Sequence, residues 1–207
     1  PAGAGKSHQS LRDISLLSNI PNLRVFHPYN NQETREVLNY SLNKKEKNNC
    51  VIRLSIGPMP NLSPTFVKNY KFSLGKGAEL IEGRDAILFT YGQTMITESS
   101  KAAKILKKKK ITLSVINLPC LNYFDKSWFN KKIEKFRNIF ILDDHNINGG
   151  LGDMLTSFLA ENDLIGNKNL KKFGFKDYPA CGTYEEVLNY HKLDYKNLAS
   201  QIKKIIK

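Results

Sequence analysis

The chain has 207 residues, which suits one or two domains and is long enough to bury a hydrophobic core. Hydrophobic residues make up 41% and aromatic residues 10% of it, as in folded globular proteins. No apolar run approaches the roughly 20 residues that span a bilayer, so we expect no membrane partner. The formal net charge is +13, but lysine is scattered along the chain and arginine is scarce. Nucleic-acid readers usually favour arginine, so we interpret the charge, including the lysine run at 107–110, as solvated surface and expect no nucleic-acid partner.

The first sixty residues predict helices and strands in alternation. Ser10 and Asp13 have capping-box spacing at the start of a helix, and Asn31 is expected to cap the next helix. The predicted elements are a helix at 10–20, a strand at 23–28, a helix at 32–42 and a strand at 50–56. Residues 57–77 are rich in proline and glycine and show no periodicity, which predicts a linker or a crossing loop.

The rest of the chain has a more regular pattern. Strands are predicted at 85–92, 111–118, 138–145 and 170–177, and helices at 95–109, 126–136, 153–162, 183–191 and 194–206. Asp125 is expected to cap the second of these helices. Strands that alternate with helices across short turns indicate an α/β sandwich around a mostly parallel sheet. The strands are nearly continuous apolar runs, as expected when helices cover both faces.

The cysteines and the first residues indicate the compartment. Cys50, Cys120 and Cys181 are widely spaced and odd in number, which predicts reduced, buried thiols in a cytoplasmic protein rather than a disulfide frame or a zinc site. The opening residues show no secretory leader. Because the sequence does not begin with Met, we expect it to start inside a longer gene product.

Two short motifs raise the possibility of a nucleotide hydrolase. Gly5-Lys6-Ser7 matches the tail of a phosphate-binding loop, and Asp143-Asp144 ends a predicted strand, where a magnesium-binding acid would lie. A phosphate-binding loop must follow a buried strand, because that strand directs the backbone amides at the phosphates. Only four residues precede Gly5 in this sequence, so an ATPase is the poorer interpretation.

Longer stretches resemble the transketolase family over almost the whole chain, in register. The beginning, "GKSHQSLRDISLLSNIPNLRVFHPYNNQETREVL", resembles the end of the pyrimidine-binding domain, in which a "G-P-T-H-Q" segment leads into a helix. The transketolase C-terminal domain is resembled by "GKGAELIEGRDAILFTYGQTM", "IFILDDHNINGGLGDML" and "FKDYPACGTYEEVLNYHKLDYKNL". The resemblance implies a remnant of a parallel-sheet pyrimidine-binding domain at 1–60, a linker at 61–78, and a three-layer α/β C-terminal domain with a mostly parallel mixed sheet at 79–207.

The resemblance implies thiamine-diphosphate chemistry. Transketolases transfer a two-carbon ketol unit from a ketose to an aldose, and the cofactor supplies the electron sink. Thiamine diphosphate and Mg would be bound mainly by an N-terminal part or subunit outside this sequence, so this chain alone is expected to be inactive. A homodimer or heterotetramer with that part is implied, with a sugar substrate. The alternatives are a deoxyxylulose-phosphate synthase-like or other thiamine-diphosphate enzyme, and a non-catalytic subunit or binding module that kept the fold.

The same resemblance assigns the candidate site residues. His8 matches the histidine of the family motif and is predicted to be catalytic and substrate-binding, since an imidazole can donate or accept a proton near neutral pH. The aspartate that contacts a substrate hydroxyl in the family falls at Ala4, and the arginine that binds the sugar phosphate falls at Ile56. Lys6 and Arg53 are therefore the candidates for a substitute phosphate ligand.

The remaining features have mainly structural interpretations. Asp144 and His145, before Gly149-Gly150, could form an anion site at the start of the next helix, or the glycines could simply permit a tight turn and close packing. Aromatic side chains at 128, 129 and 136 are expected in a core or an interface. His27 and His191 are isolated in sequence and predict no role.

Overall fold

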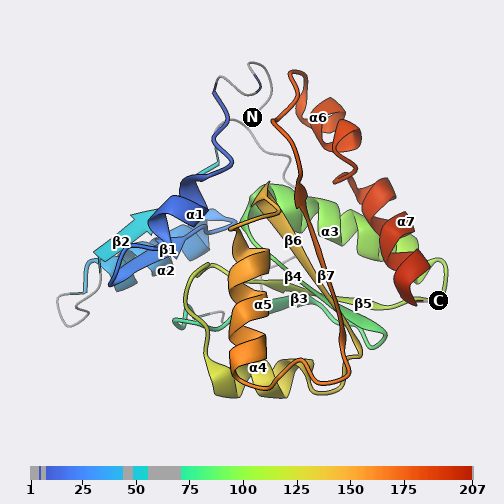
Figure 1. Ribbon diagram of the computed structural model, residues 1–207, viewed down its shortest axis with the longest axis horizontal. Coiled ribbons are helices and arrows are strands. Elements are labelled where there is room, and N and C mark those ends of the chain that lie inside the picture. The colour runs from blue at the N-terminus through green and yellow to red at the C-terminus, as the bar shows by residue number, and fades with distance from the viewer. Residues whose placement is uncertain (1–4, 6–7, 44–48, 56–70, 207) are drawn as a thin grey trace.

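The computed structural model describes residues 5, 8–43, 49–55 and 71–206, and it is an α/β protein with two sheets (Figure 1). The predicted fold class is confirmed. The first sheet and its helices comprise α1 (Asp13–Leu17), β1 (Leu23–Phe26), α2 (Asn31–Ser41) and β2 (Asn49–Ile52). The larger sheet and its helices comprise β3 (Ala78–Ile81), β4 (Ala86–Thr90), α3 (Gly92–Lys107), β5 (Leu113–Asn117), α4 (Lys126–Ile133), β6 (Asn138–Asn146), α5 (Leu151–Glu161), β7 (Asn169–Phe175), α6 (Tyr184–Tyr190) and α7 (Tyr195–Ile206).

The larger sheet has five strands in the order β3-β5-β4-β6-β7. Strands β4, β5, β6 and β7 are parallel to one another, and β3 lies antiparallel to β5 at the edge. The sheet is therefore mixed and mostly parallel, as expected. Strand β3 was not among the strands predicted from periodicity, because its four residues follow a glycine-rich stretch and are too few to establish an alternation.

Alternate residues of the central strands enter two different hydrophobic cores. Leu88, Val115 and Phe140 face α3, α6 and α7, whereas Ile87 and Phe89 face the opposite side, which α4 and α5 cover. Successive side chains of a strand point to opposite faces, so this alternation is what a doubly covered sheet requires. Figure 1 shows α5 on one face of the sheet and α3 on the other.

The two-stranded sheet is joined to the larger unit by the chain that follows β5. Phe26 of β1 forms an antiparallel bridge with Cys120. Next to that bridge, the backbone N–H of His27 donates to the carbonyl of Pro119 at 2.9 Å, and that of Leu121 donates to the carbonyl of Val25 at 2.9 Å. The segment after β5 thus runs along the edge of β1, and this backbone pairing positions the two-stranded sheet against the larger unit.

The helix starts agree only in part with the predicted caps. Asp125 caps α4 as predicted, since its side chain accepts from the backbone N–H of Trp128 at 2.7 Å. The cap of α2 is Asn30 and not Asn31, because the Asn30 side chain accepts from the N–H of Glu33. The predicted Ser10 capping box is wrong. Helix α1 begins at Asp13 without a side-chain cap.

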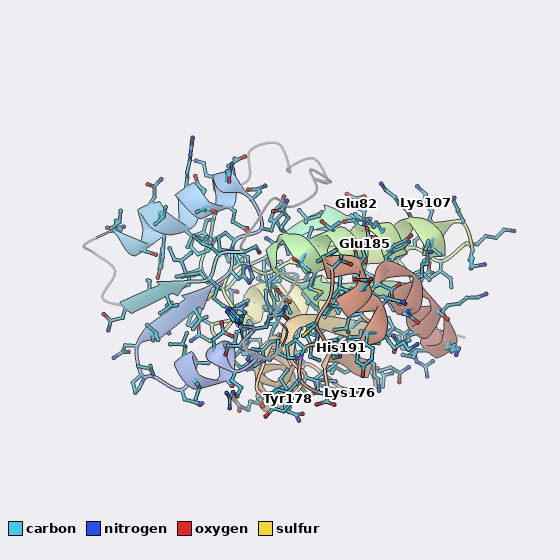
Figure 2. All side chains as sticks on the ribbon, turned by 90° about the horizontal axis from the view of Figure 1, so that it is seen from above. Glu82, Lys107, Lys176, Tyr178, Glu185 and His191 are labelled. Carbon is cyan, nitrogen blue, oxygen red and sulfur yellow. The ribbon has the colours of Figure 1, made fainter. Side chains whose placement is uncertain are left out.

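Buried and exposed side chains follow most of the other expectations. Phe129 and Phe136 lie in the core, and Trp128 packs against them. All three cysteines are free thiols. Cys120 is buried as predicted, Cys50 is only partly buried, and Cys181 is exposed, so the predicted burial of Cys181 is wrong. The lysines at 107–110 are exposed at the end of α3, where Figure 2 labels Lys107. Among the described residues, no helix combines the length and apolar character needed to cross a membrane.

Glu33 provides a stability test of the contact between the two sheets. Its fully buried carboxylate accepts from the backbone N–H of Tyr29 at 2.9 Å and from Nδ2 of Asn117, at the end of β5, at 2.7 Å. Glu33→Ala leaves both donors without this acceptor, so we expect the free energy of unfolding in urea to fall by about 3 kcal/mol. The exposed neighbour Gln32 is the control, and Gln32→Ala should change stability by less than about 0.5 kcal/mol. Equal losses in the two variants would contradict this role.

Candidate functional site

His8 lies in a turn that leads into α1, and its side chain is exposed. The backbone N–H groups of His8 and Gln9 both donate to the carbonyl of Gly5, at 3.1 and 3.0 Å. Gly5 has φ +55°, a left-handed conformation that favours glycine. The turn therefore presents the His8 imidazole to solvent from a backbone fixed at Gly5. The other candidates in this region, Lys6 and Ala4, lie outside the described residues, as does Ile56.

Arg53 follows β2 and is bound on two sides by side chains of its own unit. Its Nε donates to Oδ2 of Asp13 at 2.6 Å, and an NH1 hydrogen is donated to Nδ1 of His27 at 2.8 Å. The Arg53 side chain is only 14% exposed. Its predicted role as a phosphate ligand remains a prediction, and in that role the guanidinium would have to serve a ligand alongside these two partners.

The contact with Arg53 determines the protonation state of His27. Because Nδ1 accepts from a guanidinium that is always charged, the ring proton is on Nε2, which faces Oγ of Ser55 at 3.4 Å. Burial first, and the positive charge of Arg53 second, together lower the pKa of His27 to about 3. His27 is thus a neutral acceptor at physiological pH, although its isolation in the sequence predicted no role.

A second set of buried polar groups lies at the start of α5. Oδ1 of Asp143 accepts from the Tyr91 hydroxyl at 3.0 Å and from the N–H of Leu151 at 2.9 Å, and Oδ2 accepts from the N–H of Gly152 at 2.7 Å. Burial raises the pKa of Asp143 to about 7, while the three donors act against that rise. A Cβ added at Gly150 would lie 2.7 Å from Oδ1 of Asp143. The close-packing interpretation of these glycines therefore holds, and the protein's own carboxylate occupies the helix start where an external anion would bind.

These two sets meet in what we call the interdomain polar cluster. Oδ1 of Asp13 lies 3.8 Å from Nε2 of His145, and the Arg53 guanidinium carbon lies 5.9 Å from the centre of the Tyr91 ring. The His27 and Tyr91 ring centres are 5.4 Å apart. The cluster consists of Asp13, His27 and Arg53 from the first unit and Tyr91, Asp143 and His145 from the second.

The chemistry of the two regions differs. The members of the interdomain polar cluster are largely buried and contact one another, so the cluster can hold the two units in register. His8 presents an exposed imidazole, the side chain best suited to exchange protons with a ligand near neutral pH. The sequence gives no signal for the cluster, because its partners are far apart along the chain. Asp13 and Arg53 are 40 positions apart, and no local spacing connects them.

The described residues do not form a cofactor cradle by themselves. No group of three or more His, Cys, Asp or Glu side chains among them is arranged to hold a metal ion. The N-terminus of α5, the helix start beside the cluster, is occupied by the Asp143 carboxylate. A diphosphate and its metal therefore do not fit the residues that the structure describes.

Comparison with known proteins identifies the family. The model of the transketolase C-terminal domain matches residues 75–198, and that of the transketolase pyrimidine-binding domain matches residues 1–59. The chain belongs to the transketolase family. Its resemblance to that family, stated from the sequence, is thereby confirmed.

Individual transketolase-family relatives are longer than this chain. A putative transketolase C-terminal section from Methanocaldococcus jannaschii is 29% identical over 96% of this chain and 60% of that protein. A 1-deoxy-D-xylulose-5-phosphate synthase from Halothermothrix orenii is 28% identical over 84% of this chain and 26% of that enzyme. A solved structure described as a split-gene transketolase, inactive beta4 tetramer, has a TM-score of 0.82 at 24% identity, over 98% of this chain and 64% of that chain. The last comparison shows a shared fold.

The state of His27 in this transketolase-family chain predicts a specific pH dependence of stability. Folded His27 stays neutral down to about pH 3, whereas in the unfolded chain it takes up a proton near its ordinary pKa of 6.5. The stabilisation is therefore present above pH 6.5 and is lost as the pH falls from there toward 3. Between pH 7.5 and 5.5, wild type should lose about 1.4 kcal/mol of unfolding free energy more than His27→Gln does. Urea titrations at the two pH values measure this difference, and parallel losses would show that His27 is protonated in the fold.

Proposed function

We propose that this chain is the C-terminal part of a thiamine-diphosphate-dependent transketolase, which transfers a two-carbon ketol unit from a ketose donor to an aldose acceptor. The observation that carries the proposal is the exposed imidazole of His8, in a motif matched to the family, on a turn anchored at Gly5. An imidazole at this place would donate a proton to a substrate oxygen or accept one from it as the C–C bond breaks or forms.

The cofactor is proposed to be held elsewhere in the complete enzyme. Thiamine diphosphate and Mg would bind mainly to an N-terminal part or subunit, and the chemistry supplied there is stabilisation of the carbanion formed at the two-carbon unit. The chain spans 60% of the M. jannaschii relative, which supports a further part. A homodimer or heterotetramer in the cytoplasm fits this arrangement. The boundaries 1–60, 61–78 and 79–207 are proposed for its two domains and their linker.

A deoxyxylulose-phosphate synthase-like reaction is the second candidate. The observation that favours it is the 28% identity with the H. orenii enzyme. Two assays of the complete enzyme separate the candidates. A transketolase transfers a two-carbon unit from a ketose to an aldose, whereas a synthase of the second kind is recognised by formation of 1-deoxy-D-xylulose 5-phosphate. A chain active in neither assay with its cofactor-binding part present would favour a non-catalytic subunit.

His8 provides the direct test of the proposed chemistry. In the complete enzyme, His8→Ala should lower kcat by about a hundredfold or more, the usual scale for loss of a positioned acid–base group. Cofactor affinity, measured by calorimetry, should stay unchanged because His8 is proposed to contact the substrate. The control is Gln201→Ala in the C-terminal helix α7, which should retain full activity. Normal turnover in His8→Ala would contradict the role.

The donor substrate is predicted from the residues at two family positions. Ile56 stands where the family has its phosphate-binding arginine, Ala4 stands where it has a hydroxyl-binding aspartate, and Arg53 already binds Asp13. A charge-assisted bidentate pair is stronger than a neutral hydrogen bond. Without one, we expect the complete enzyme to prefer a smaller or unphosphorylated donor, measured as kcat/KM for xylulose against xylulose 5-phosphate.

A hundredfold preference for the phosphate, about 2.7 kcal/mol, would contradict this expectation. Lys6→Ala and Arg53→Gln would then identify the substitute ligand. Loss of the preference in one variant alone assigns the phosphate to that side chain.

A further inference from the structure

The turn that carries His8 begins against a loop of the larger unit. Gly5 is buried, and a Cβ added to it would lie 2.6 Å from Sγ of Cys181 and 3.0 Å from the carbonyl oxygen of Pro179. An approach of 2.6 Å is closer than real Cβ atoms come to a neighbour, so a side chain at Gly5 would require Gly5 or the Cys181 side chain to move. Figure 1 shows the blue trace that leads into α1 rising toward the loop before α6.

This receiving loop is itself held in place. Pro179 is buried, and the backbone N–H of Ala180 donates to Nε2 of His191 at 3.1 Å. The His191 ring packs edge-on against Phe175 of β7 with 4.7 Å between ring centres. In Figure 2, Tyr178 lies at the edge of the molecule and His191 on the inner side of the same region. The loop at 179–181 is therefore held against the sheet through His191 and contacts Gly5 from a fixed position.

The other end of the His8 segment also contacts the larger unit. The N–H of Asn146 donates to the carbonyl of Leu11 at 3.4 Å, and a Cβ added at Gly149 would lie 2.7 Å from Cβ of Ser15. Ile14 is fully buried in the same core as α5. Both sides of His8 thus meet the larger unit, at 179–181 before it and at 146–149 after it.

We propose that the larger unit positions His8, with the backbone of the loop at 179–181 as the positioning element against which Gly5 packs. The proposal rests on the proposed function for its catalytic readout. A displacement of about 1 Å of a catalytic group can reduce turnover by a hundredfold. The carbonyl of Gly5 accepts from both His8 and Gln9, so a shift of Gly5 is transmitted directly to the His8 backbone.

Gly5→Ala tests the contact, and the chain offers a matched control. Gly166 has φ +50°, close to the φ +55° of Gly5, but a Cβ added there meets nothing within 4 Å. Both substitutions place a side chain at a similar positive φ, and only Gly5→Ala meets the 179–181 loop. We expect Gly5→Ala to shift the Cε1–H resonance of His8 in NMR spectra of this chain and to lower kcat of the complete enzyme at least tenfold. Gly166→Ala should leave the resonance and kcat unchanged.

Rescue by Cys181→Ala separates positioning from general damage. That change removes Sγ, the nearest atom to the added Cβ. In the Gly5→Ala background it should return the His8 resonance toward its wild-type position and recover at least threefold of the lost kcat, while Cys181→Ala alone changes kcat less than twofold. Additive effects of the two substitutions, or equal effects of Gly5→Ala and Gly166→Ala, would overturn the proposal.

Chemical modification of Cys181 replaces Gly5→Ala if that variant does not fold. A bulky maleimide attached to the exposed Cys181 of the folded Cys50→Ala chain would displace Gly5 in the same way. An unmoved His8 resonance would then overturn the proposal. The kinetics of His8→Ala test the catalytic role of His8 separately. Normal turnover in His8→Ala refutes that catalytic role. A strong loss of turnover in His8→Ala, together with no coupling between Gly5 and Cys181, refutes only the positioning by the loop and leaves the catalytic role standing.

Discussion

The rest of the site depends on the contacts that are made by the Asp13 carboxylate. It binds Arg53 at 2.6 Å and faces His145 at 3.8 Å, so it joins α1 to the end of β2 and to the end of β6. The Asp13 carboxylate is about one-third exposed and the Arg53 guanidinium is largely buried. The pair gains less from its charges than from its geometry, because removing a guanidinium from water costs free energy. The pair contributes a defined orientation of α1, and α1 carries the His8 turn.

Arg53 also explains why a buried histidine can be tolerated beside it. A protonated imidazole 2.8 Å from a guanidinium would place two positive charges in contact in a buried site. Neutral His27 instead accepts a hydrogen bond, and its Nε2 faces Ser55. The Cε1 and Nε2 atoms of His27 would lie 2.9 Å from a Cβ at position 92, which is why Gly92, with φ +66°, follows Tyr91. Electrostatics and packing therefore select the same arrangement.

The sequence predicted the fold well because periodicity is a local signal. The strands and helices of the larger sheet, the Asp125 cap and the buried Phe129 follow from residues within one element. Strand β3 has four residues, and it lies at the edge through pairing with β5 rather than through its own pattern. The interdomain polar cluster could not be predicted for a related reason. His27 has no partner close to it in the sequence, and its role follows from its contact with Arg53, 26 positions away. The exposure of Cys181 could not be predicted either, because this residue lies in a loop without hydrophobic periodicity.

The two units are best understood as one framework for a single segment. Backbone pairing between β1 and the chain after β5 fixes the smaller sheet, and the core shared by Ile14 and Val25 with α5 fixes α1. Neither contact orients the residues before α1. The first of those residues that the structure describes is Gly5, whose neighbour is 176 positions later in the chain, at Cys181. A catalytic side chain on such a segment would depend on the larger unit for its position, even where that unit supplies no group that reacts.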